Sequence, residues 1–64
     1  MWEMSRFVGK FVRDGKVLII IIKNEYIWEA NVLGNDKVIK GNSFIDTRRK
    51  AILVANECGW GIDA

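Results

Sequence analysis

The fold of this 64-residue chain is decided in residues 13–23, which read RDGKVLIIIIK. Asp14-Gly15 predicts a two-residue hairpin turn, because a type I′ turn needs positive φ at both central residues. The aliphatic run that follows, Val17–Ile22, is mostly β-branched and favours an extended strand. A lysine flanks this run at each end and acts as a gatekeeper against strand aggregation. The segment therefore predicts an antiparallel hairpin.

Strand signals continue on both sides of this hairpin. Residues 5–13 alternate and predict the first strand, which pairs with a second strand over residues 16–23. A third strand is expected over residues 26–33 and a short fourth over residues 37–40, each preceded by turn residues. Because short hairpins are the commonest connection between strands, the strands should pair in chain order.

The last third of the chain changes to helical spacing. Between Thr47 and Cys58 there is neither Gly nor Pro, and small or apolar residues recur three or four positions apart. Asp46 or Thr47 is expected to cap the start of this helix, and Gly59 to end it. The sequence predicts an α+β fold, a four-stranded antiparallel meander (ββββα) with one C-terminal helix packed on one face. Residues 1–64 form one small domain, with an ordered core from about 5 to 62.

Composition excludes most chemistry. The chain has no His, so an imidazole base, an imidazole ligand and a His-based triad are all excluded. Its one cysteine, Cys58, cannot form a four-cysteine zinc site and is expected in the core. The acidic residues fall mostly in turns and caps, and no phosphate-binding glycine loop is present. We therefore expect a protein that is not an enzyme, with no metal, no cofactor and no small-molecule substrate.

The same counts suggest a compartment. A small secreted domain usually carries several disulfides, which a single cysteine cannot provide within one chain. The N-terminus does not resemble a secretory signal, and the longest apolar run is far shorter than the roughly 20 residues of a membrane span. A cytoplasmic protein without a membrane partner is expected, in a host cell if the gene belongs to a phage.

The strand over residues 16–23 is apolar on both faces, whereas one helix covers only one. With a two-residue turn, Phe11 should oppose Leu18 and Phe7 should oppose Ile22. Which third-strand residues join each face depends on the next loop, because a one-residue slip exchanges the faces. The apolar interface candidates on the other face are Val8, Val12, Val17, Ile19 and Ile21.

Several segments could cover this second apolar face. The candidates are the C-terminal tail over residues 59–62, the N-terminal Trp2 and Met4, a second copy of the chain, or a partner protein. Trp2 and Trp60 are possible aromatic anchors for a partner. If the chain's own termini cover the second apolar face, that face is part of the core and not a binding surface.

A cluster of cations, Arg48-Arg49-Lys50, is expected in the first helical turn. Cations there oppose the helix dipole, at a cost of about 0.3–1 kcal/mol each. Free backbone N–H groups together with cations would form an anion site for phosphate or for a partner's carboxylates. Lys37 and Lys40 could extend this patch. The alternative is a basic turn that contacts only water.

Part of this region resembles double-stranded RNA-binding domains. Their last helix begins with a Ser-Lys-Lys-x-Ala-Lys-x-x-Ala-Ala pattern after a three-stranded sheet. The matching residues here are Thr47, Arg48, Arg49, Ala51 and Ala55. Ile52 replaces the third lysine of the pattern, Asn56 replaces its second alanine, and the family's first helix has no counterpart. The resemblance covers residues 26–58 and implies that the basic helix start grips phosphates.

Two further resemblances point to phage proteins. Residues 41–51, with Phe44 and Thr47, resemble the arm-binding domain of phage integrases, although the Phe-to-Thr spacing is one residue longer here. Such domains read DNA through a sheet, and the apolar strand here is too hydrophobic for base edges. The short, disulfide-free, single-domain form is similar to phage-encoded inhibitors of host machinery, including anti-CRISPR proteins.

The leading hypothesis is a non-enzymatic protein-binding module, encoded by a phage or mobile element, that inhibits a host nucleic-acid-processing or defence complex. The first alternative is a nucleic-acid-binding domain that grips phosphates with the basic start of its helix. The second alternative is a structural homodimer that associates through the sheet.

Overall fold

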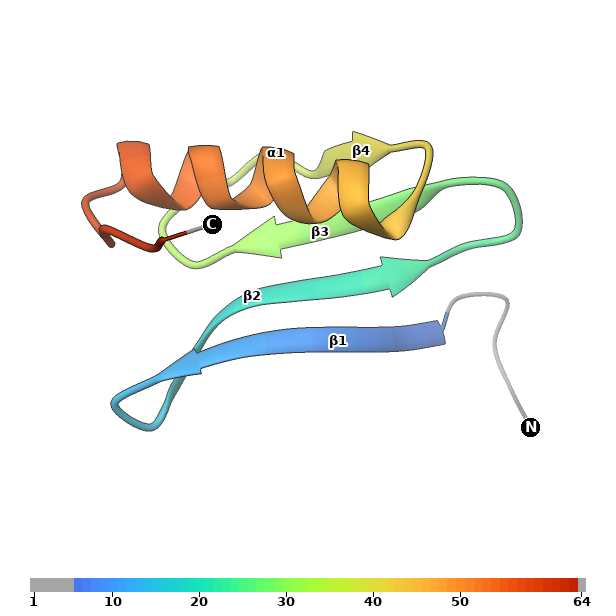
Figure 1. Cartoon of the computed structure of the whole chain (residues 1–64). Helices are drawn as coiled ribbons and strands as arrows, with labels where there is room; N and C mark the ends of the chain where they lie inside the picture. Colours follow the sequence, from blue (N-terminus) through green and yellow to red (C-terminus); the bar gives the residue numbers. More distant parts are fainter. Residues whose placement is uncertain (1–5, 64) are drawn as a thin grey trace.

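The computed structural model describes residues 6–63, and the side chains of residues 9–63. One antiparallel sheet with strand order β1-β2-β3-β4 is followed by a single helix (Figure 1). This arrangement confirms the predicted α+β meander with its C-terminal helix. The elements are β1 (Arg6–Arg13), β2 (Lys16–Lys23), β3 (Trp28–Val32), β4 (Ile39–Gly41) and α1 (Phe44–Glu57).

The turn between β1 and β2 has the predicted form. Asp14 has a φ of 52° and Gly15 a φ of 78°, as both central residues of a type I′ turn require. Arg13 pairs with Lys16 across the turn. The Asp-Gly pair therefore fixes where the two long strands begin to pair.

A β-bulge at Leu18 changes the register that simple alternation predicts. Phe11 pairs with Ile19 and Val12 with Val17, so Leu18 has no partner on β1. The predicted opposition of Phe11 and Leu18 is therefore wrong. A second irregularity, between Phe7 and Gly9, restores the predicted pairing of Phe7 with Ile22.

The bulge lets two consecutive residues of β2 enter the core. Leu18 is 1% exposed and Ile19 is 3% exposed, whereas strict alternation would turn one of them to the other face. A bulged residue re-aims its side chain because it lies outside the regular pleat. The core gains one more large aliphatic side chain from the same strand.

The hydrophobic core lies between the helix and one face of the sheet. Ile19 pairs with Val32 and Ile21 with Ala30, which places these four side chains on one face. The helix packs its small residues against β2, β3 and β4 (Figure 1). Its Phe44 side chain extends toward Gly9 of β1. The helical core residues are Thr47, Ala51, Ile52 and Ala55.

The helix begins at Phe44, three residues before the predicted start. Ser43 is the N-cap, and its Oγ accepts a hydrogen bond from the Asp46 N–H at 3.1 Å. The carboxylate of Asp46 accepts from the backbone N–H of Asn42 at 3.2 Å. This arrangement resembles a capping box, which satisfies backbone donors before and inside the first turn. The expected caps, Asp46 and Thr47, lie inside the helix instead.

The helix ends at Glu57, and Gly59 follows with a φ of 95°, as predicted. The Trp60 N–H donates to the Ala55 carbonyl at 3.1 Å, and the Gly59 N–H to the Asn56 carbonyl at 3.0 Å. These two bonds form a Schellman motif. Cys58 is exposed at the C-cap, so its predicted place in the core is wrong.

Within residues 6–63, the one helix is too short and too polar to cross a membrane.

Candidate binding surfaces

The basic residues of the helix do not lie in its N-terminal turn. Because α1 starts at Phe44, Arg48-Arg49-Lys50 falls in the second turn rather than the first. The first turn carries the acidic Asp46, which suits the positive end of the helix dipole. The predicted placement of the three cations in the first turn is therefore wrong, and Ser43 and Asp46 form the cap at that end.

The predicted cations also point in different directions. Lys50 forms an ion pair with Asp46 at 3.2 Å, and its Nζ donates to the Lys40 carbonyl at 3.2 Å. Arg48 lies on the opposite flank of the helix, where it lines a hollow next to β1. Arg49 is exposed. Residues at consecutive helical positions are about 100° apart, so the three cations cannot close around one anion.

The strand lysines do not complete a single patch either. Lys40 lies on β4, where it pairs with Glu29 of the neighbouring strand. Lys37 is exposed in the connection between β3 and β4, at the end of the sheet near the helix C-terminus (Figure 1). The structure therefore separates Lys37 from Arg48-Arg49-Lys50.

Asp46 is the one titratable group among the described residues with a resolved shift. The hydrogen bond from the Asn42 N–H, followed by the Lys50 ammonium, lowers its pKa below the ordinary value for Asp. Both contacts favour the charged carboxylate. The shift is explained by the helix cap and does not mark an acid–base centre.

The sheet face turned away from the helix, which we call the open face, carries an apolar stripe. Lys10 pairs with Ile20 on this face, and alternation along β1 places Val12 there with its partner Val17. Val12 is 48% exposed and Val17 is 39% exposed. Ile20 and Ile22 are half-buried. No helix of the described chain packs on the open face.

The predicted interface set is only partly correct. Ile19 and Ile21 are buried beneath the helix, because the bulge puts them on the core face. Ile20 and Ile22 take their place on the open face and were missed. Hydropathy gives no signal for this exchange, since Val17–Ile22 is apolar throughout. The side chain of Val8 lies outside the described residues.

The C-terminal tail covers part of the core rather than the open face. Ile62 is 4% exposed and belongs to the core cluster. Trp60 packs against the same cluster, and its indole N–H donates to the Leu33 carbonyl at 3.4 Å. Trp60 is therefore a packing residue in this fold, and Trp2 lies outside the described residues.

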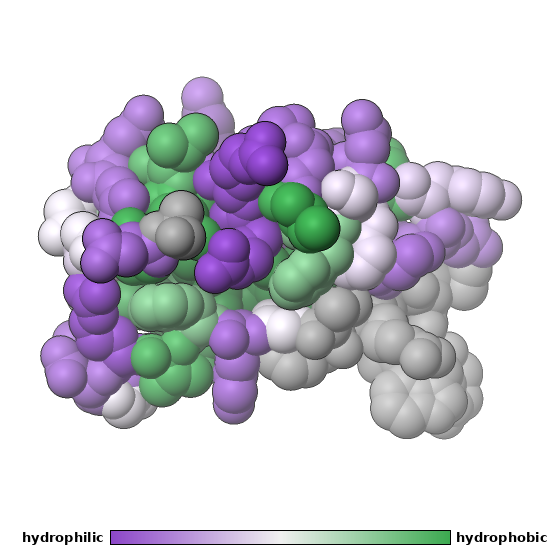
Figure 2. All heavy atoms as spheres, viewed as in Figure 1, coloured by the Kyte–Doolittle hydropathy of each residue, from purple (hydrophilic) through white to green (hydrophobic). Residues whose placement is uncertain are grey.

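A hollow opens between β1 and the helix. It has a volume of about 120 Å³ and is lined mainly by apolar atoms of Phe11, Phe44 and Ile52, with Arg48 beside them. Gly9 forms part of its wall, and a Cβ on Gly9 would lie 3.6 Å from the Phe44 ring. Figure 2 shows hydrophobic surface between the helix and the β1–β2 edge, interrupted by hydrophilic residues.

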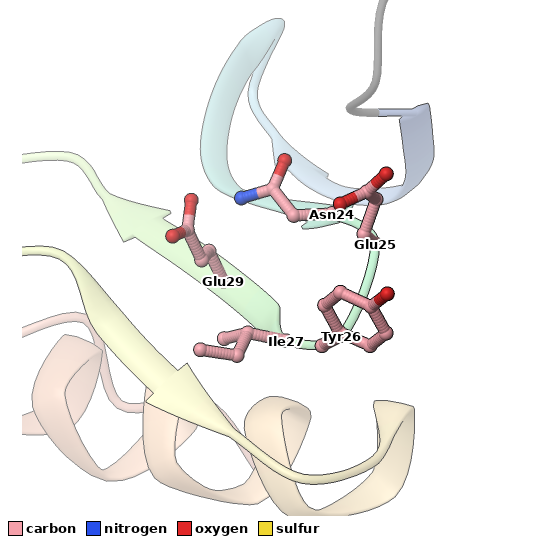
Figure 3. A pocket seen from close by; sticks show the side chains of 5 residues that line it. All are labelled: Asn24, Glu25, Tyr26, Ile27 and Glu29. Atoms are coloured by element: carbon pink, nitrogen blue, oxygen red, sulfur yellow. The ribbon is translucent and has the colours of Figure 1, made fainter.

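A second hollow of about 240 Å³ lies at the turn between β2 and β3 (Figure 3). Its side chains include two carboxylates, Glu25 and Glu29, and the ring of Tyr26, which is 89% exposed. The Asn24 N–H donates to the Ile27 carbonyl at 2.9 Å and closes the turn beneath them. The hollow itself is acidic, whereas Lys23 and Lys40 lie on the strands next to it.

Positive charge is concentrated in the β1–β2 hairpin. Residues 6–23 contain five cations and one anion, a net charge of +4, whereas the whole chain has a net charge of +2. The rest of the chain is therefore slightly acidic. The hairpin cations are Arg6, Lys10, Arg13, Lys16 and Lys23.

Among the described residues, no three potential metal ligands lie together. No family model matches the chain, and neither a curated protein nor a solved structure shows significant similarity to it. The surfaces described above are therefore the basis for assigning a function.

Proposed function

We propose that this protein is a non-enzymatic protein-binding module whose binding surface is the open face of the sheet. The observation that carries the proposal is the apolar stripe of Val12, Val17, Ile20 and Ile22. The solvent-facing side of an antiparallel sheet is normally polar. Polar side chains of Lys10, Glu29 and Asn31 lie on the same face, and an apolar patch with a polar rim is typical of a protein interface.

Two features support binding rather than chemistry. The one shifted carboxylate, Asp46, is engaged in the helix cap. Both hollows are small, with volumes of about 120 and 240 Å³, below the roughly 300–1,000 Å³ of small-molecule pockets. Inhibition of a host nucleic-acid-processing or defence complex is one use of such a module, and that role stays a prediction.

A nucleic-acid-binding domain is the second candidate, favoured by the net charge of +4 on the hairpin. Its site would be the hairpin rather than the helix start, because Lys50 is paired with Asp46 and Arg48 lies on the other flank. A phosphate binder would lose affinity steeply with added salt.

The double variant Val12→Lys/Val17→Glu tests the open face. The two residues pair across the strands, so the new charges face each other, and the net charge is unchanged. Ile45→Lys/Leu53→Glu is the matched control, since Ile45 is 68% exposed and Leu53 60% exposed on the helix. Urea unfolding and circular dichroism establish that all three proteins are folded.

The binding readout is quantitative mass spectrometry of proteins retained by each form from its host cells. We expect a defined set of proteins to be retained by the wild type and the helix control, and lost by the open-face variant. Equal retention by all three forms, or no specific retention by the wild type, would contradict the proposal. Sedimentation of the same proteins tests the homodimer, which should dissociate only in the open-face variant.

A further inference from the structure

The edge of β1 that faces away from β2 is a separate surface from the open face, and it runs the length of the strand. We infer that this edge takes an extended segment of the partner protein as a fifth strand, and that the segment alternates acidic and aliphatic residues. The inference rests on the proposed protein-binding function and names the chemistry of the partner.

The first argument is the unpaired backbone of β1. This strand lies at the end of the sheet order and spans eight residues, Arg6–Arg13. It pairs with β2 along one edge, and nothing else in residues 6–63 pairs with its other edge. A long free edge presents a row of N–H and C=O groups that another extended chain can pair with.

The second argument is charge. Lys10 and Lys16 are exposed on a hairpin of net charge +4, whose one acid is Asp14 in the turn. A second copy of β1 would place a strand with three cations and no acid beside an identical one, and like charges across a strand pair are destabilising. An acidic segment has the complementary charge. The edge therefore favours a foreign acidic strand over a second copy of this chain.

The third argument is the hollow beside β1. Because the helix lies over β2, β3 and β4, a strand added to β1 would turn alternate side chains toward the space beside Phe11, Phe44 and Ile52. The apolar part of that lining suits aliphatic side chains, and the cations Lys10 and Arg48 also border the hollow. The other side chains of the added strand would face the same side as Lys10, where carboxylates are favoured.

Single-stranded nucleic acid fits the same edge less well. Bases bind to sheets by stacking on exposed aromatic rings. The described aromatic side chain with the greatest exposure, Tyr26, lies in the turn between β2 and β3, beside Glu25 and Glu29 (Figure 3). Those carboxylates repel phosphates, so the observations favour an acidic peptide.

A labelled synthetic peptide tests the inference directly. The probe alternates Glu and Val over the length of β1, and its binding to the full chain is followed by fluorescence anisotropy at low salt. Two control peptides replace Glu by Lys or carry N-methyl groups on alternate amides, which removes the donors of one edge. Slower amide exchange along β1 on peptide binding reports strand pairing.

Two protein variants test whether the peptide binds to the cations of the hairpin. Lys10→Glu/Lys16→Glu reverses two exposed cations of the hairpin, whereas Lys37→Glu/Arg49→Glu makes the same change in net charge elsewhere. We expect the first variant to bind the Glu-Val peptide about tenfold more weakly, and the second to change by less than about twofold. Equal weakening by both variants would show that only the net charge of the protein matters. That result would overturn the assignment of the peptide site to the hairpin.

The remaining outcomes separate the inference from the proposed function. No binding of the Glu-Val peptide, or equal binding of its N-methylated form, overturns the edge assignment. Binding of a DNA or RNA oligonucleotide in place of the peptide also overturns it, in favour of nucleic acid. If the host partner is lost by Val12→Lys/Val17→Glu but not by Lys10→Glu/Lys16→Glu, the proposed function stands and the edge assignment fails. Peptide pairing on β1 without any effect of the open-face variant supports the edge and contradicts the open face.

Discussion

Asn56 and Ile62 are joined by a reciprocal pair of hydrogen bonds between one side chain and one backbone unit. The amide Nδ2 of Asn56 donates to the Ile62 carbonyl at 3.0 Å, and its Oδ1 accepts from the Ile62 N–H at 2.5 Å. Arg13 donates to the carbonyl of Trp60 and ties the same tail to the hairpin. A helix residue and a strand residue thus hold the C-terminal tail over the core.

Asn56→Ala should therefore destabilise the fold by about 1–3 kcal/mol, because it leaves two backbone groups of Ile62 without partners and loosens a buried side chain. Urea unfolding measures the change. Glu57→Ala, at the neighbouring exposed position, is the control and should have little effect. Equal stability of the Asn56 variant would show that the tail is held by other contacts.

Gly41→Ala should destabilise the protein by about 1–3 kcal/mol, through overlap rather than backbone strain. A Cβ at this buried position would overlap the Thr47 hydroxyl and lie 3.0 Å from the Thr47 Cα. Gly9→Ala is the matched control, since its Cβ would make an ordinary 3.6 Å contact with the Phe44 ring. We expect Gly9→Ala to be neutral or slightly stabilising. A shift in thermal midpoint of similar size for both variants would contradict this account.

Stability should fall in acid partly through Asp46. Its folded-state pKa is depressed, so the charged carboxylate stabilises the fold above the unfolded-state pKa of about 3.9. That contribution is lost as the pH falls through the folded-state value. Asp46→Asn keeps an oxygen acceptor for the Asn42 N–H but cannot titrate. Its unfolding free energy should vary less than that of the wild type below about pH 4. Identical pH profiles would exclude Asp46 as a contributor.

Cys58 should react with a thiol reagent in the folded protein at the rate of an accessible thiol. Its side chain is exposed at the end of the helix. Cys58→Ser should accordingly change the unfolding free energy by less than about 0.5 kcal/mol. If the thiol reacts only after the protein unfolds, the Cys58 side chain is buried in the core, as helical spacing alone predicts.

The sequence predicts the arrangement of elements well, and it predicts the faces of the sheet less well. Asp14-Gly15 and Gly59 require positive φ, and such local requirements are visible in the sequence. The bulge at Leu18 has no such signal, because every residue from Val17 to Ile22 is apolar and fits either face. The exchange of Ile19 and Ile21 for Ile20 and Ile22 on the open face follows from that bulge alone.

The start of the helix could have been predicted from a different signal. Ser43 precedes Asp46 by three residues, which is the spacing of a capping box. A cap at Asp46 or Thr47 predicts a helix that starts three residues later, which puts Arg48 in the first turn. The candidate anion site depended entirely on that shift.

The order of sheet and helix along the chain has a consequence for synthesis. Ile19 and Ile21 are made before the side chains that cover them, Ala51, Ile52 and Ala55, which follow the whole sheet. A nascent chain that ends before these residues exposes its most aggregation-prone strand. The lysines at 16 and 23 oppose aggregation of this strand during that interval, but they cover none of its apolar surface. Premature termination should therefore yield fragments that fail to fold rather than smaller folded ones.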